Sequence, residues 1–305
     1  MEPAKTMDKT NRILFEKPDL KFLTTHYTVV DTHFHSRYSD GADTVEAIAE
    51  QSHKLGIGVA ITDHNEIRGA VALNSFKRVL SIPGIEVTSA EGTHLLVYFY
   101  DIKSLERFFL QHVEPFMGRD VMSATRLKMD SIIQRAREYK SVIIFPHPYS
   151  AAYTGICNSF FSSFQMEQLF QQVDGLEVLN ASNLHRWNTR CALLGFNLDK
   201  AMIGGSDGHQ LAYMGQAVTY AECNPSRRAF LDAVRRNETK VIGKEMALFR
   251  KVTTNGSKLK INFRNYPDLM EKNIRYGYKV INIKSRKLRN NVKERLSGWD
   301  RKRQR

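Results

Sequence analysis

The stretch Asp31–Gly41, with the sequence DTHFHSRYSDG, follows the apolar pair Val29-Val30. Side chains alternate between the two faces of a strand, so we expect His33 and His35 to lie on the same face and to reach one metal ion. Asp40 follows in the turn SDG and can bend back over the same end of the strand. The stretch therefore predicts a strand that leads directly into metal ligands.

Histidines and acids recur where further apolar runs end. Six of the ten histidines lie at such places, which scattered surface histidines would have no reason to do. The further residues of this kind are Asp63, His64, Glu86, His94, His147, Asp207 and His209. In a barrel of parallel strands, the strand ends meet at one mouth. Imidazoles and carboxylates that converge there are the ligands of a multinuclear metal site.

Strand-like and helix-like segments alternate along residues 27–245. The pattern predicts strands at 27–31, 57–62, 78–82, 95–100, 141–145, 175–179, 201–204, 216–220 and 239–242. It predicts helices at 43–55, 104–113, 121–139, 165–173, 186–194 and 226–236, and Gly195 is expected to end the fifth of these. Such alternation indicates an α/β protein with parallel strands and covering helices. The expected closed form is a (β/α) barrel, which can be distorted and short of eight strands.

Charge divides the 305-residue chain unevenly. The chain has 45 basic and 32 acidic residues. From Arg235 onward there are 22 basic and 6 acidic residues, which leaves 23 basic and 26 acidic residues in 1–234. We expect an N-terminal arm over residues 1–26, a barrel over 27–245 and a basic extension over 246–305. A basic extension favours contact with nucleic acid or an anionic surface, although such tails are at least as often only solvated.

The composition makes several classes of protein unlikely. The three cysteines, Cys157, Cys191 and Cys223, are far apart and form no CxxC pair. Neither a disulfide framework nor a thiolate zinc site is therefore expected, and a cytoplasmic location fits best. The first residues lack the apolar core of a secretory signal, and no apolar run approaches the length of a transmembrane segment.

Seven segments resemble the polymerase-and-histidinol-phosphatase (PHP) family in the order in which they occur. They are Asp31–Gly41, 61–64 (ITDH), 84–87 (GIEV), 94–95 (HL), 145–148 (FPHP), 175–178 (GLEV) and 205–209 (GSDGH). A single HxH pair would be a weak signal, whereas the ordered set is specific. The resemblance implies a distorted (β/α)7 TIM-like barrel with a di- or trinuclear metal centre at the carboxyl ends of its strands.

The resemblance also implies ligands, position by position. These are His33, His35, Glu86 and Asp207 for a first metal, Glu86, His94 and His147 for a second, and Asp40, His64 and His209 for a third. A carboxylate such as Glu86 can bridge two cations with its two oxygens. Zn, Mn and Fe all suit a mixed imidazole and carboxylate set, so two or three divalent ions of these kinds are expected.

Two positions distinguish this sequence within the family. Some members carry histidine where this chain has Asp40, and the aspartate resembles the branch with nucleotide-bisphosphate phosphatases and a 5′-to-3′ RNA exonuclease. Asn65 replaces the last aspartate of the usual TDHD motif. Because that position is not among the implied ligands, we expect the metals to be retained and the contacts with substrate to differ.

The activity that the resemblance implies is metal-assisted hydrolysis of phosphoesters. Asp63 is expected to orient His64 or neighbouring groups without binding metal itself, and Glu177 to support the site from an apolar strand. Phosphate recognition calls for arginine, because its planar fork matches phosphate oxygens. Position alone makes Arg37, Arg126 and Arg186 the candidates.

The leading hypothesis is a metal-dependent phosphoesterase whose substrate is a nucleotide, a short oligonucleotide or a small phosphorylated metabolite. The basic residues 246–305 favour nucleic acid, since lysine and arginine contacts to phosphate supply affinity without sequence preference. One alternative is a histidinol-phosphatase-like phosphomonoesterase, in which residues 246–305 have no role. Another is a metal-retaining scaffold or nucleic-acid-binding module that acts through this basic tail. A lone strand-end histidine is more often structural, so the inference depends on the whole set.

Overall fold

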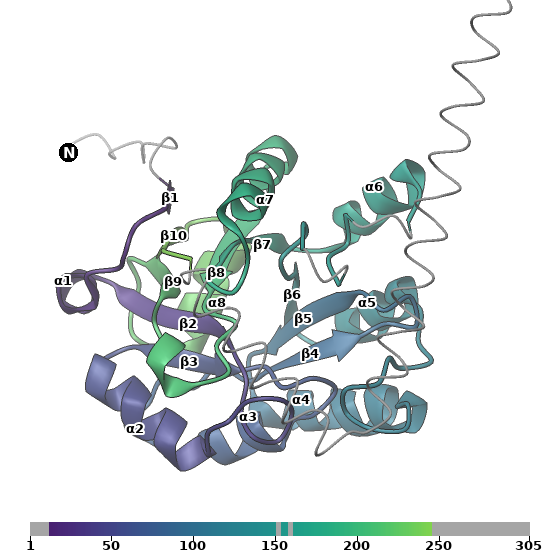
Figure 1. Cartoon of the computed structure of the whole chain (residues 1–305). Coiled ribbons are helices and arrows are strands. Elements are labelled where there is room, and N and C mark those ends of the chain that lie inside the picture. Colours follow the sequence, from purple (N-terminus) through teal and green to yellow (C-terminus); the bar gives the residue numbers. More distant parts are fainter. Residues whose placement is uncertain (1–11, 151–153, 158–160, 246–305) are drawn as a thin grey trace, which may run out of the picture. The chain divides into compact units, whose positions relative to one another are not determined.

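The computed structural model describes residues 12–150, 154–157 and 161–245, which form a mixed α/β fold. The strands belong to two five-stranded sheets (Figure 1). In order, the first sheet contains β1 (Ile13–Leu14), β10 (Lys240–Gly243), β9 (Ala217–Ala221), β2 (Thr28–Phe34) and β3 (Gly58–Ile61). The second contains β4 (Gly84–Thr88), β5 (His94–Phe99), β6 (Ser141–Phe145), β7 (Gly175–Asn180) and β8 (Ala201–Gly205).

The expectation of one closed barrel of parallel strands is not confirmed. Four strand pairs are antiparallel, namely β9–β10, β2–β9, β4–β5 and β5–β6. One cause is local: residues 89–93 join β4 to β5 by a tight hairpin with no crossover helix, and the backbone N–H of Ser89 donates to the carbonyl of Thr93 at 2.9 Å. Within the described residues, the two sheets meet through isolated bridges such as His64–Glu86 instead of a continuous ladder.

Most helices lie against the outer faces of the sheets, as Figure 1 shows for α2 below β3, whereas α8 packs into the core between the sheets. They are α1 (Leu20–His26), α2 (Val45–Leu55), α3 (Arg68–Leu73), α4 (Ile102–Phe108), α5 (Met129–Arg137), α6 (Ser163–Gln172), α7 (His185–Leu198) and α8 (Arg227–Arg235). Local sequence explains their ends. Thr44 caps α2 by accepting the backbone N–H of Ala47, and Gly56 ends it at a φ of 69°.

At three predicted elements, the structure differs from the sequence prediction. Residues 78–82 form no strand, and only a single bridge joins Ser81 to Val59. Residues 121–128 form a turn followed by irregular backbone, so the helix predicted from 121 begins at Met129. Helix α7 continues past Gly195. A Cβ atom at this position would lie only 2.8 Å from the side chain of Val178. Gly195 therefore serves close helix–sheet packing and not helix termination.

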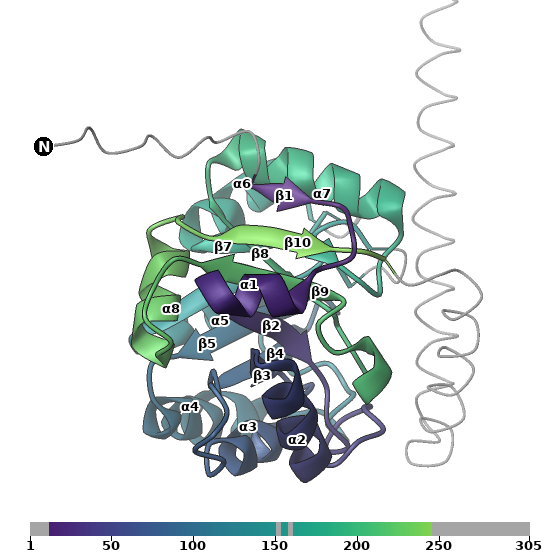
Figure 2. The same ribbon diagram turned by 90° about the vertical axis from the view of Figure 1, so that its left-hand side faces the viewer.

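The N-terminal segment is not a separate arm over its described part. Strand β1 pairs in parallel with β10, and α1 precedes β2 (Figure 2). The buried Arg12 guanidinium donates to the carbonyl of Thr239 and, at 2.6 Å, to the side chain of Asn237. Short elements with few apolar residues gave no periodic signal in the sequence, which is why they were missed.

The core between the two sheets holds the strand ends in place. Alternate residues of β5 face opposite sides, so Leu96 and Tyr98 point away from Leu95, Val97 and Phe99. Leu96 and Tyr98 share one cluster with Val30 and Ala60 of the first sheet, and Phe230 of α8 joins the same cluster. Side chains from both sheets therefore fix the carboxyl ends of β2 and β3 relative to β4 and β5.

Within the described residues, no helix combines the length and the apolar character needed to cross a membrane.

We expect Arg12→Ala to lower the free energy of unfolding by about 1–3 kcal/mol, because it leaves the buried carbonyl of Thr239 without its donor. Urea unfolding measures the change. Arg78→Ala removes an exposed arginine and is expected to stay within about 0.5 kcal/mol of the wild type. An equal, small effect of both substitutions would contradict the structural role of Arg12.

Candidate metal centre

All nine residues expected to bind metal lie together at one edge of the two sheets. His33 belongs to β2, and His35 and Asp40 follow it; His64 follows β3, His147 follows β6, and Asp207 and His209 follow β8. Glu86 lies within β4. His94 differs from the expectation, because it begins β5 instead of ending a strand. An antiparallel strand begins where its neighbour ends, so His94 reaches the same edge.

The carboxylate of Glu86 lies at the centre of this cluster. Its Oε1 atom is 2.8 Å from His94 Nδ1 and 3.5 Å from His147 Nε2. Its Oε2 atom is 3.1 Å from His64 Nδ1, 3.4 Å from His33 Nε2 and 3.4 Å from His35 Nε2. The side chain is buried. The two oxygens thus face different sets of imidazoles, as a carboxylate shared between two cations would.

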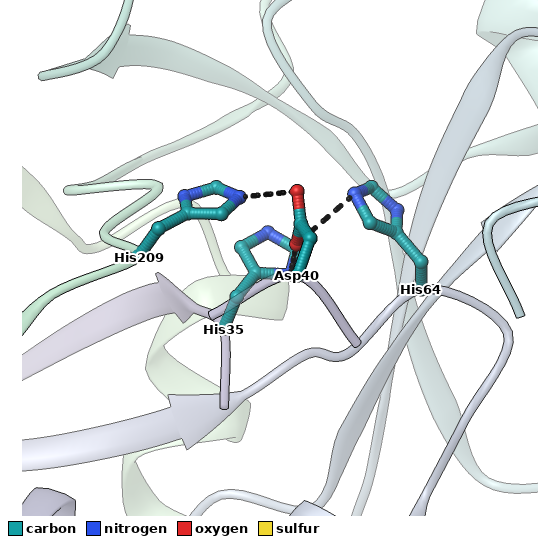
Figure 3. A group of neighbouring side chains, drawn as sticks. All are labelled: His35, Asp40, His64 and His209. Carbon is teal, nitrogen blue, oxygen red and sulfur yellow. Dashed lines mark hydrogen bonds and ion pairs between the residues drawn. The ribbon is translucent and has the colours of Figure 1, made fainter. Parts of the chain in front are cut away.

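Asp40 is the centre of a second group, which Figure 3 shows with His35, His64 and His209 around it. His209 Nε2 lies 2.9 Å from Asp40 Oδ2, and His64 Nε2 lies 3.8 Å from Oδ1. The ring of His35 stacks between the rings of His64 and His209, at centroid distances of 4.6 and 4.4 Å. One ligand atom from each of the four residues lies within 4.8 Å of the others.

Two further groups satisfy the same distance limit of 4.8 Å, one of His33, His35 and Asp207 and one of His64, Glu86 and His94. These groups resemble the three ligand sets that the family resemblance implies, but some residues belong to more than one group. His35 belongs to the group around Asp40 as well as to the one with His33, and His64 belongs to two groups. His147 approaches the cluster through Glu86. The assignment of particular ligands to particular ions stays a prediction.

Burial and nearby carboxylates act on the cluster in opposite directions. Against the effect of burial, Glu177 and Glu86 hold the pKa of His33 well above its usual value, and Glu86 raises the pKa of His147. Desolvation lowers the pKa of His64 to about 3 and, together with the nearby His209, lowers that of His35. Burial alone would raise the pKa of Glu86, but the surrounding imidazoles hold it well below its usual range. Neutral imidazoles with free lone pairs and an ionised carboxylate are the forms that bind divalent metal ions. The donor set therefore fits such ions.

Glu177 supports the site from β7, as the sequence indicated. Its Oε1 atom lies 3.0 Å from His33 Nδ1, and its Oε2 atom accepts the backbone N–H of His147 at 2.9 Å. Asn180 donates to the same Oε2 atom at 2.9 Å and lies 3.3 Å from Asp207 Oδ2. A carboxylate behind a ligating histidine fixes the direction of its ring. The sequence analysis missed Asn180, although it ends a strand like the residues that it singled out.

The hydrogen bonds of Asp63 hold a neighbouring loop, which is one of the two roles expected for it. It accepts hydrogen bonds from the backbone N–H of Ser36 at 2.7 Å, from the Ser36 hydroxyl at 2.6 Å and from the Ser39 hydroxyl at 2.6 Å. These bonds fix the turn that carries Asp40. Burial raises the pKa of Asp63 to about 7. Gly69 is required beside it, because a Cβ there would collide with the Asp63 carboxylate.

Asn65 has a structural role, and the expectation that substrate contacts differ because of this position stays a prediction. Its side chain is buried and donates to the carbonyls of Val121 and Ser123 at 2.8 and 2.9 Å. Its Oδ1 atom accepts the backbone N–H of Thr88 at 2.9 Å. The φ of 46° is one that asparagine tolerates well. An aspartate would offer no donor to the two carbonyls.

Among the described residues, the contacts of the three arginines proposed for phosphate binding are with residues outside the cluster. Arg37 is exposed on the loop before Asp40. Arg126 donates to the carbonyls of Met117 and Pro115 at 2.8 and 2.7 Å, and so holds a neighbouring turn. Arg186 lies 5.1 Å from the ring of Trp187. Their assignment as phosphate-binding residues stays a prediction, which position in the sequence alone motivated.

Comparisons with known proteins agree with this geometry. An uncharacterized protein from Methanocaldococcus jannaschii is 27% identical over 167 residues, which cover 50% of this chain and 81% of that protein. A lesion-specific endonuclease, endonuclease Q from Pyrococcus furiosus, has a similar structure, with a TM-score of 0.59 at 17% identity over 70% of this chain and 57% of that one. A two-domain protein from Bacteroides vulgatus, which contains a predicted PHP-like metal-dependent phosphoesterase, gives a TM-score of 0.53 at 18% identity over 81% and 73%. Because the sequence identities are low, the two similar structures show only that the fold is shared.

The fold and the histidine–carboxylate cluster define a metal-dependent hydrolase of phosphoester bonds. The PHP domain model matches residues 31–209, and a PHP-associated model matches residues 185–239. The chain belongs to the PHP family.

Asp63→Asn is expected to lower the free energy of unfolding by about 1–3 kcal/mol, since one acceptor oxygen becomes a donor that faces other donors. Loosening of the turn with Asp40 is expected to weaken metal binding about 10–100-fold. Urea unfolding and competition with a chelating dye measure the two effects. Asp130→Asn, at an exposed position on α5, serves as the control. If Asp63→Asn changes stability and metal affinity no more than Asp130→Asn does, the role assigned to the Asp63 carboxylate is refuted.

Proposed function

We propose that this protein hydrolyses phosphate esters of nucleotides, short oligonucleotides or a small phosphorylated metabolite through a di- or trinuclear metal centre. The arrangement around Glu86 supports this proposal most strongly, because each carboxylate oxygen faces its own set of histidines. A buried carboxylate surrounded in this way suits two cations on its two sides. Zn, Mn and Fe are all compatible with these ligands.

The proposed ligand sets follow the groups described above. His33, His35, Glu86 and Asp207 would hold one ion, Glu86, His94 and His147 a second, and Asp40, His64 and His209 a third. Such ions, when bound, clamp phosphate oxygens, lower the pKa of a bound water and neutralise developing charge.

The protein's own residues prepare this chemistry by fixing the ligands in a site shielded from solvent. Glu177 holds His33 at 3.0 Å and the backbone of His147 at 2.9 Å, so two ligands from different strands keep a constant relative position. Asp63 does the same for the turn that carries Asp40. His33, His35 and Glu86 are almost completely buried, which strengthens electrostatic interactions with a bound phosphate.

Nucleic acid is the substrate class that we favour within this proposal. The endonuclease with the same fold acts on nucleic acid, and the excess of basic residues in 246–305 would add affinity for phosphates. Residues 246–305 lie outside the described residues, so the basic extension stays a prediction. The three dispersed cysteines are free, which supports a cytoplasmic location.

The test measures phosphate release by metal-loaded protein from nucleoside 3′,5′-bisphosphates, histidinol phosphate and a 5′-phosphorylated RNA oligomer. We expect Glu86→Gln to reduce turnover more than about 100-fold, since loss of even an outer partner of a metal ligand costs about 10–100-fold. Treatment with a chelator is expected to have the same effect. Glu50→Gln, at an exposed position of α2, should retain full turnover.

Turnover that survives both Glu86→Gln and the chelator would rule out the proposed chemistry. Release from histidinol phosphate alone would favour the phosphomonoesterase, and no release from any ester would favour a scaffold that only binds nucleic acid.

A further inference from the structure

Two aromatic side chains lie on the segments that follow β6 and β7, at the same edge of the second sheet as the candidate metal centre. Tyr149 follows His147 by two residues in the loop after β6, and Trp187 lies in the first turn of α7, after β7. Strands β6 and β7 are parallel neighbours, so the segments that follow them leave the sheet on the same side. Two residues of chain span at most about 7 Å, which places Tyr149 close to the ligand His147.

The two rings form a platform together with two arginines. The ring planes of Tyr149 and Trp187 are 9° apart, and their centroids are separated by 6.4 Å. The guanidinium of Arg190 lies 4.1 Å from the centroid of Tyr149 and 5.3 Å from that of Trp187. Arg186 lies 5.1 Å from the Trp187 ring. We call these four residues the aromatic platform.

The backbone of the platform is connected to the metal centre. Asn183 donates to the carbonyl of Tyr149 at 2.7 Å, and the backbone N–H of Asn183 donates to the carbonyl of Asn180 at 3.0 Å. Asn180 in turn contacts Glu177 and Asp207. The side chain of Cys191 lies against the backbone of Tyr149, with a distance of 3.4 Å from the amide nitrogen to sulfur. A ligand held on the platform would therefore have a fixed position relative to the cluster.

The charge of the platform distinguishes a binding role from simple packing. Arg186 and Arg190 are exposed, and neither has a carboxylate partner in the part of the chain that the structure describes. Packing over aromatic rings needs only the apolar stems of the side chains. Two unneutralised guanidinium groups over half-buried rings suit a ligand that is both aromatic and anionic. Nucleotides combine these properties, since their bases stack on aromatic rings and their phosphates pair with arginine.

We propose that Tyr149, Trp187, Arg186 and Arg190 form a subsite for the base of a nucleotide whose phosphate ester lies at the metal centre. The inference rests on the proposed phosphoesterase function and names a nucleotide as its substrate. The base stacks on the aromatic platform, and the arginines neutralise a neighbouring phosphate. A phosphorylated metabolite without a base would leave the platform empty.

Tryptophan fluorescence tests this directly, because the chain contains two tryptophans, Trp187 and Trp299. In a Trp299→Phe background, Trp187 is the sole reporter. The metal-loaded protein is titrated with the phosphonate analogue of adenosine 5′-phosphate, which has no ester to hydrolyse, and with inorganic phosphate, which has no base. We expect saturable quenching by the nucleotide analogue and none by phosphate.

Arg190→Ala in the same background is expected to weaken binding of the analogue about tenfold, through loss of its cation–π and phosphate contacts. Arg228→Ala, at an exposed position of α8, is the matched control and should bind as the parent does. Equal quenching by both ligands, or quenching by neither, would contradict the proposed base subsite and leave the proposed phosphoesterase function unaffected. Quenching without phosphate release from any ester would instead refute the phosphoesterase and leave a nucleotide-binding site.

Discussion

The structure depends above all on one buried carboxylate, Glu86, surrounded by five imidazoles at 2.8–3.5 Å. A buried charge is costly unless it is paired, and burial also makes histidines such as His64 reluctant to take up a proton. Nearby carboxylates raise the pKa of His33 and His147 but leave that of His35 lowered, so protonated imidazoles can pair with only part of the negative charge of the cluster. Divalent cations on the two sides of Glu86 would resolve this conflict, which is why we regard the site as built for them.

The remainder of the fold holds this group in place. Strands from both sheets bring the candidate ligands to one edge, and the shared core of Leu96, Tyr98, Val30 and Ala60 fixes the sheets against each other. Buried acids behind the ligands act on different segments: Glu177 fixes His33, and Asp63 fixes the turn with Asp40. The aromatic platform adjoins the same edge, so binding of a base and hydrolysis of its phosphate ester would share one supporting network.

Much of this arrangement was predictable from sequence, and the exceptions have physical causes. Candidate ligands such as His33, His64 and Asp207 carried a signal because each follows an apolar run, and the structure brings them together. Antiparallel pairing was missed because a hairpin such as residues 89–93 has no distinctive periodicity. The structural role of Asn65 was not predicted, because its contacts with Val121 and Ser123, 56 and 58 residues away, are invisible in a local pattern.

The central claim is that Glu86 lies between two metal ions. Anomalous diffraction at the absorption edge of the bound metal, from crystals of metal-loaded protein, tests it most directly. The account predicts two or three peaks within the cluster, with the two carboxylate oxygens of Glu86 each contacting a different ion. A single peak, or peaks that make no contact with Glu86, would contradict the multinuclear centre and the hydrolytic chemistry inferred from it.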